Sequence, residues 1–191
     1  MLGKMDRIQN YISHLQGVLE RLALPDVRRS IDVIMEAYYA EKQIFVIGNG
    51  GSASTASHLA CDLGKGTSMP GKPRFRVISL TDNVATMSAW SNDVSYEHVF
   101  VEQLKNLVNS EDVVIGISAS GNSENVIRAM RHAKEIGCKT IGWSGFGGGT
   151  LATICDVNVI VDSNYYGPVE DVHLILNHVL HAWIREELAS T

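Results

Sequence analysis

The stretch Ile117-Ser118-Ala119-Ser120-Gly121-Asn122-Ser123 joins an apolar run at residues 112–117 to a helical pattern that begins near residue 122. A loop of this kind can hold an anion without a positive side chain. The N–H groups at a helix N-terminus carry partial positive charge, serine hydroxyls add donors, and glycine lets the backbone approach a phosphate closely. Taken alone, the stretch is explained about as well by an ordinary Ser/Gly turn with a helix cap.

A second glycine-rich loop, Gly48-Asn49-Gly50-Gly51-Ser52-Ala53, occupies the same place in another strand, loop and helix unit. It follows an apolar run at residues 43–47 and precedes a helical stretch at 53–63. In an open parallel sheet the carboxyl ends of the strands lie along one edge, so two such loops can face one ligand. The pair therefore predicts one anion held from two sides.

Strand-like and helical patterns alternate along the rest of the chain. The strand-like runs lie at residues 43–47, 74–80, 112–117, 139–143 and 157–161, and the helical stretches that separate most of them at 53–63, 95–108, 122–136 and 148–154. This alternation predicts an α/β fold with a mostly parallel sheet. We expect one domain over residues 1–191.

Three more helices lie at the two ends of the chain. Amphipathic spacing predicts helices at 5–22 and 25–39, and a long apolar helix is predicted at 169–188. The last helix is apolar over more than one face and needs cover on several sides. Packing between subunits would provide this cover, and the helices at about 1–40 would contribute to it. Burial within one chain explains the apolar faces nearly as well.

Composition and charge exclude several classes of protein. Hydrophobic residues make up 45% and charged residues 19% of the chain, which excludes a disordered protein. The formal charge is −5 and no basic run exceeds two residues, so nucleic-acid binding is not predicted. No apolar run approaches the ~18–20 residues of a membrane span, and no secretory signal is seen. The three cysteines form no C-x-x-C pair, which indicates free thiols, and we expect a soluble cytoplasmic protein.

Four side chains are candidates for acid–base chemistry or metal binding. His58 and Asp62 are four residues apart and share one helix face, as two ligands of a zinc ion or an acid–base pair would, although a surface hydrogen bond explains the spacing as well. Glu170 and His178 are eight apart, which on an α-helix means about 12 Å of rise and about 80° of rotation. They reach one small site only if Glu170 sits at a bent start of the helix, or if they serve sites in different subunits.

Two further turns are less specific. Ala89-Trp90-Ser91-Asn92-Asp93 predicts a polar turn whose Asn92 and Asp93 either cap the next helix or contact a substrate. The glycines of residues 145–149 form another turn, which either brings backbone close to a ligand or is simply flexible.

Read together, these motifs resemble the sugar isomerase (SIS) domain family, and more closely its phosphoheptose isomerase branch. The resemblance covers nearly the whole chain and rests on GNGGSA at 48–53, the acid four residues after His58, NDxxY at 92–96, SxSGNS at 118–123 and the histidine of the last helix. It implies a three-layer, flavodoxin-like sandwich with a five-stranded parallel sheet and additional N-terminal helices. It also implies a homotetramer with active sites at subunit interfaces.

The resemblance implies an aldose–ketose isomerisation of sedoheptulose 7-phosphate to D-glycero-D-manno-heptose 7-phosphate through an enediol. The residues expected to bind the phosphosugar are Asn49, Gly50, Gly51, Ser52, Ser118, Ala119, Ser120 and Ser123, with Asn92 and Asp93 on its hydroxyls. Zinc, one divalent ion per site, is expected on His58, Asp62, Glu170 and His178, of which the last three also serve as catalytic residues. No nucleotide cofactor is expected.

Two positions depart from the family pattern. The acid at 62 is usually Glu and here is Asp62, and the usual Gln of the last helix is here Glu170.

Two other functions stay open. A non-catalytic SIS protein could bind a phosphosugar, or a partner such as the replication initiator DnaA. A dinucleotide-binding turn at 48–53 is the least favoured, because the nearest acid after a strand, Asp82, lies 34 residues after Gly48 rather than about 20.

Overall fold

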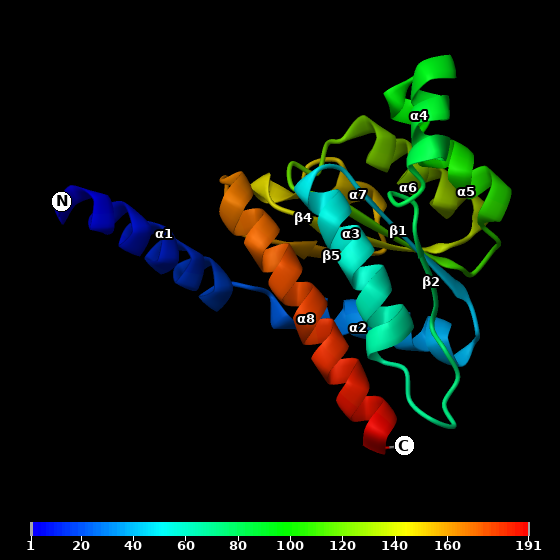
Figure 1. The fold of residues 1–191 in the computed structure, drawn as a ribbon, viewed down its shortest axis with the longest axis horizontal. Coiled ribbons are helices and arrows are strands. Elements are labelled where there is room, and N and C mark those ends of the chain that lie inside the picture. The colour runs from blue at the N-terminus through cyan, green and yellow to red at the C-terminus, as the bar shows by residue number, and fades with distance from the viewer. Residues whose placement is uncertain (1, 191) are drawn as a thin grey trace.

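The fold is seen in a computed structural model that describes residues 2–190, and a parallel sheet lies at its centre (Figure 1). The strands are β1 (Gln43–Gly48), β2 (Arg76–Ser79), β3 (Val113–Ser118), β4 (Lys139–Ser144) and β5 (Val157–Ile160). Their order across the sheet is β2-β1-β3-β4-β5, and every neighbouring pair is parallel. The chain order reverses between β1 and β3, which is where open α/β sheets bind their ligands.

Helices flank the sheet on both faces. The α-helices are α1 (Leu2–Glu20), α2 (Leu24–Tyr39), α3 (Gly51–Cys61), α4 (Val84–Asp93), α5 (Val101–Leu107), α6 (Glu124–Ile136), α7 (Leu151–Ile154) and α8 (Tyr166–Ser190). A π-helical turn, η1 (Asp62–Gly66), continues α3, and η2 (Tyr96–His98) and η3 (Phe146–Gly148) are short 3-10 turns.

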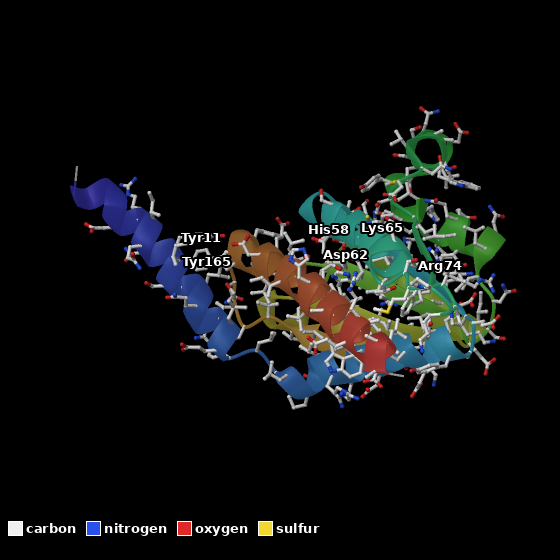
Figure 2. The ribbon with its side chains drawn as sticks, turned by 60° about the horizontal axis from the view of Figure 1, so that its bottom comes forward. Tyr11, His58, Asp62, Lys65, Arg74 and Tyr165 are labelled. Carbon is white, nitrogen blue, oxygen red and sulfur yellow. The ribbon has the colours of Figure 1, made fainter. Side chains whose placement is uncertain are left out.

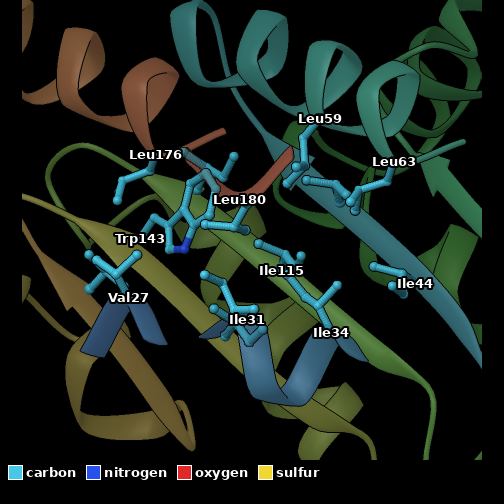
Figure 3. Close-up of a cluster of buried hydrophobic side chains, with 14 of the residues drawn as sticks. Val27, Ile31, Ile34, Ile44, Leu59, Leu63, Ile115, Trp143, Leu176 and Leu180 are labelled. Atoms are coloured by element: carbon cyan, nitrogen blue, oxygen red, sulfur yellow. The ribbon is translucent and has the colours of Figure 1, made fainter. Parts of the chain in front are cut away.

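Alternation along the strands divides the apolar side chains between two cores. In β1, Ile44 and Val46 face a core that holds α2, α3 and α8, whereas Phe45 and Ile47 face a core that holds α5, α6 and α7. Figure 3 shows part of the first core, where Trp143 and Ile115 of the sheet meet Leu176 and Leu180 of α8. The predicted three-layer α/β sandwich is confirmed.

Helices α3 and α8 lie side by side and run in the same direction (Figure 1). A Cβ at Gly51, the first residue of α3, would overlap the Glu170 carboxylate near the start of α8. Further along, His58 contacts His178, and the Arg185 guanidinium donates to the carbonyl of Gly66 at 2.7 Å. Side chains of these two helices therefore meet at successive levels.

The segment between β2 and β3 differs from the sequence prediction. The single helix expected at 95–108 is wrong, because the structure has the short turn η2 and the separate helix α5 there. The predicted turn at 89–93 is also wrong, since these residues are the last turns of α4. Asn83 caps α4, its side-chain oxygen accepting from the Thr86 N–H at 3.0 Å. No residue of α4 is buried. The helix therefore lacks the periodic apolar pattern from which an amphipathic helix is predicted.

Helix α1 extends away from the sheet (Figure 1), and its second half packs Leu15, Val18 and Leu19 against the first core. Polar contacts add to this packing along α1 and just after it. The Tyr11 hydroxyl donates to Asp171 at 2.5 Å, and Arg21 pairs with Asp162 at 2.7 Å. Figure 2 shows Tyr11 and Tyr165 where α1 passes the start of α8. Within residues 2–190, no helix has both the length and the apolar character required to cross a bilayer.

Candidate active site

The two loops singled out by sequence are neighbours at the carboxyl edge of the sheet. Gly48 at the end of β1 pairs with Ile117 of β3, so the chain leaves both strands side by side. Two hydrogen bonds between side-chain amides tie the first loop to the first turn of α6, which directly follows the second loop. Asn49 donates to Asn125 at 2.8 Å and Asn125 donates back to Asn49 at 2.9 Å. The expected proximity of the two loops is confirmed, and their use for one ligand stays a prediction.

The loop of residues 118–123 is held in shape by its own hydrogen bonds. The Ser118 hydroxyl donates to the Ser123 hydroxyl at 3.1 Å, and the Asn122 N–H donates to Ser120 Oγ at 3.2 Å. Ser118 and Ala119 are buried, whereas Ser120 and Ser123 are partly open to solvent. The open hydroxyls lie beside the N-terminus of α6, where an anion is stabilised by the helix dipole.

A third loop, at residues 145–149, braces the second one. Gly121 has φ +66°, and a Cβ there would overlap the carbonyl oxygen of Gly148. The Gly145 N–H donates to the Ala119 carbonyl at 2.8 Å, and the Thr150 N–H donates to the Asn122 side chain at 2.9 Å. The glycines at 145–149 thus support the shape of the serine loop through close backbone packing.

The first loop ends where α3 begins. Gly50 has φ +55°, which glycine adopts readily, and it occupies the N-cap of the helix. Ser52 is buried in the first turn, 4% exposed. The Glu170 carboxylate lies directly over Gly51 and leaves no room for a side chain there. Glu170 therefore stands at the N-terminus of α3 in this chain.

His58, Asp62 and His178 form a second group, farther along α3. One possible ligand atom from each lies within 4.8 Å of the other two. His58 Nε2 is 3.4 Å from Asp62 Oδ2, and the rings of His58 and His178 have centroids 5.0 Å apart. Figure 2 shows His58 and Asp62 near the carboxyl end of α3. This three-residue group does not include Glu170.

The donor set of this group fits a divalent metal ion. Two imidazoles and one carboxylate are ligands that zinc accepts, and a catalytic zinc keeps a further position open. The side chains of His58 and Asp62 are 42% and 17% exposed, so solvent or substrate can reach the group. The group also contains an imidazole and a carboxylate that can move protons without a metal.

The anion-binding loops and the His58 group are separated along one helix. His58 follows Gly51 by seven residues, which corresponds to about 10 Å along an α-helix. A ligand that carries an anion at one end and a reactive group at the other can reach both sites at once.

The other sequence candidates, Asn92 and Asp93, are the last two residues of α4. Asn92 and Asp93 are exposed, and the Asn92 amide donates to the Asp93 carboxylate at 2.8 Å. The tyrosine of the same motif, Tyr96, reaches the first loop, since its hydroxyl donates to Asn49 Oδ1 at 2.8 Å.

Sequence reasoning missed two buried asparagines of the site. Asn125 is 3% exposed and joins the two loops, and Asn177 is fully buried and donates to Asp62 Oδ2 at 3.2 Å. Both stand beside apolar residues on the inward side of a helix, where a polar side chain needs a partner. A polar residue at such a position is the signal that could have identified them.

Comparisons with known proteins give one consistent result. The family model of the SIS domain matches residues 9–145. The phosphoheptose isomerase of a Nitratiruptor species is 39% identical over 154 residues, 81% of this chain and 82% of that protein. The phosphoheptose isomerase of Aliarcobacter butzleri is 35% identical over 95% of this chain and 97% of its own. The solved structure of a phosphoheptose isomerase from Neisseria gonorrhoeae matches with a TM-score of 0.88 at 26% identity, over 95% of this chain and 98% of that one.

Proposed function

This chain belongs to the SIS domain family, in its phosphoheptose isomerase branch, and we propose that it interconverts sedoheptulose 7-phosphate and D-glycero-D-manno-heptose 7-phosphate. One observation carries the proposal: a pre-formed anion cradle and an imidazole–carboxylate group lie along the same helix, about 10 Å apart. A ketose with its phosphate on the last carbon has its carbonyl at the other end of the molecule. The phosphate and the reacting carbons are then bound at separate places.

The cradle binds the phosphate through backbone N–H groups and hydroxyls. The residues we assign to it are Asn49, Gly50, Gly51, Ser52, Ser118, Ala119, Ser120 and Ser123. Neutral donors of this kind suit a phosphate at the N-terminus of α6. At the N-terminus of α3 the Glu170 carboxylate lies over Gly51, so a phosphate bound there requires this side chain to move or to be neutralised. Asn92 and Asp93 are assigned to the hydroxyls of the sugar.

The reaction moves two protons. A base takes a proton from C1 of the ketose while an acid gives one to the C2 carbonyl oxygen, which forms the enediol. Return of a proton to C2 and loss of the O1 proton give the aldose. We assign these transfers to Asp62 and His178. Glu170, a further candidate from the sequence, joins them only if α8 of another subunit supplies it.

The same side chains would hold a zinc ion. His58, Asp62 and His178 offer the ligands in this chain, and Glu170 of a neighbouring subunit is the fourth candidate. When bound, zinc polarises the carbonyl of the substrate. His58 and His178 would each supply an imidazole nitrogen to such an ion, and Asp62 a carboxylate oxygen.

Exposed apolar residues support assembly into a homotetramer with sites at subunit interfaces. Ile8 and Ile12 of α1 are 60% and 44% exposed, and Val179, next to His178, is 45% exposed. A catalytic group that is open to solvent in one chain needs cover to exclude water. We propose that residues 1–191 act as one domain, that about 1–40 pack between subunits, and that the enzyme is cytoplasmic.

A turnover assay tests this function. The purified protein is incubated with a panel of ketose and aldose phosphates, and product is followed by NMR before chelation, after chelation and after addition of zinc. We expect aldose product from sedoheptulose 7-phosphate, loss of turnover with chelator and recovery with zinc. Binding of the sugar phosphates without product would identify a non-catalytic SIS protein instead.

A further inference from the structure

The side chain of Asn177 is placed where it can control the direction of the Asp62 carboxylate. Asn177 precedes His178 on α8 and is fully buried, whereas His178 is exposed. Its amide donates to Asp62 Oδ2 at 3.2 Å, across the contact between α8 and the end of α3. We propose that Asn177 is a positioning residue of the isomerase, an inference that rests on the proposed function of Asp62.

The geometry around Asp62 explains why it needs such a partner. Asp62 is the first residue of the π-helical turn that continues α3, where the regular helical backbone ends. The same oxygen, Oδ2, is 3.4 Å from His58 Nε2. The Asn177 amide donates to this oxygen and the His58 imidazole lies near it, which leaves the other carboxylate oxygen for a proton or a metal ion.

The surroundings of Asn177 argue against a purely structural role. Leu176 and Leu180, its neighbours on α8, are buried among apolar side chains. Among the described residues, Asn177 Oδ1 has no hydrogen-bond partner, although the atom is buried. An unpaired buried carbonyl destabilises the fold, and leucine, which has nearly the same size, would avoid this cost. A residue that lowers stability beside a reactive group is expected at a functional site.

The test replaces Asn177 by leucine in the full chain. We expect Asn177→Leu to fold with a Tm equal to or above that of the wild type. Its kcat falls by about 10–100-fold, the range found for groups that orient a ligand or catalytic residue, while KM changes little. Binding of cobalt(II), followed by its visible absorption, weakens by a similar factor because the Asp62 carboxylate is no longer held.

Gln103→Leu is the matched control. Gln103 is another buried amide, but its side chain donates to the backbone carbonyls of Leu80 and Val99 at 3.2 and 2.7 Å. We expect this variant to lose Tm and to keep kcat, the reverse of the result for Asn177→Leu.

Each outcome decides one question. Unchanged kcat and unchanged cobalt affinity in Asn177→Leu overturn the positioning role, and so does a loss of activity that only follows a loss of Tm. If the wild type turns over no sugar phosphate, the proposed function fails. The cobalt measurement then still decides whether Asn177 holds Asp62.

Discussion

The anion cradle and the His58 group are built in opposite ways. In the cradle, three loops of one chain brace one another, the side-chain amides of Asn49 and Asn125 bridge two of them, and glycines occupy places where a Cβ does not fit. The His58 group consists of side chains from two helices, two of them exposed, and one buried amide supports it. The proposed phosphate site is therefore pre-organised in the single chain, whereas the proposed reacting group is open to completion by substrate, metal or another subunit.

This contrast predicts different phenotypes. Changes in the cradle alter stability and substrate affinity together, because its shape is part of the fold. Changes in the exposed histidines alter turnover and leave stability unaffected.

Replacement of His178 by alanine has the largest expected effect. Loss of a general acid or base lowers kcat by about 10²–10⁴-fold, whereas the Tm stays within a degree or so of the wild type because the ring is exposed. Steady-state kinetics and thermal unfolding measure the two effects. Glu186→Ala, an exposed change on the same helix, serves as the control. Full turnover by His178→Ala excludes His178 as the acid–base residue.

Gly121→Ala tests the shape of the serine loop. The added Cβ meets the Gly148 carbonyl at a positive φ, so we expect a loss of about 1–3 kcal/mol in the free energy of unfolding and a KM raised at least tenfold. Gly71→Ala is the control, since Gly71 has φ +78° with no atom within 4 Å of the added Cβ. It should lose some stability and keep its KM. Equal KM values for both variants would contradict the role of the loop.

Asn125→Ala tests the bridge between the two loops. It removes both amide hydrogen bonds to Asn49, and each lost hydrogen bond costs about 0.5–1.5 kcal/mol of stability. KM rises several-fold while kcat is preserved. A double-mutant cycle with Asn49→Ala, read by urea unfolding, should give a coupling energy of about 0.5–3 kcal/mol. Additive losses would show that the two amides act independently.

His173→Leu has no expected effect on turnover at neutral pH but changes stability in acid. Burial lowers the pKa of His173 to about 4, from 6.5, so the folded protein keeps this ring neutral. As the pH falls, the unfolded chain binds a proton at His173 before the folded protein does. The free energy of unfolding therefore decreases as the pH falls from 6.5 toward 4. Tm measured against pH should fall less steeply in the variant. Parallel curves for the two proteins would contradict this.

The sequence predicted the sheet and both loops because strands buried on two faces and glycine-rich turns leave strong local patterns. The helix at 84–93 was missed because it buries no residue and so shows no apolar periodicity. The four-residue spacing of His58 and Asp62 correctly placed them together, and His178 joins them only because α8 runs beside α3. Asn125 and Asn177 depend on contacts between distant segments, which no local pattern reports.

The central claim is that proton transfer at the His58 group acts on a sugar whose phosphate is held in the cradle. Incubation with sedoheptulose 7-phosphate in D2O, followed by NMR, tests it most directly. We predict aldose heptose 7-phosphate with deuterium at C2, formed far more slowly by His178→Ala. Recovery of the ketose unchanged and without deuterium, from a wild-type protein that binds it, would contradict the claim.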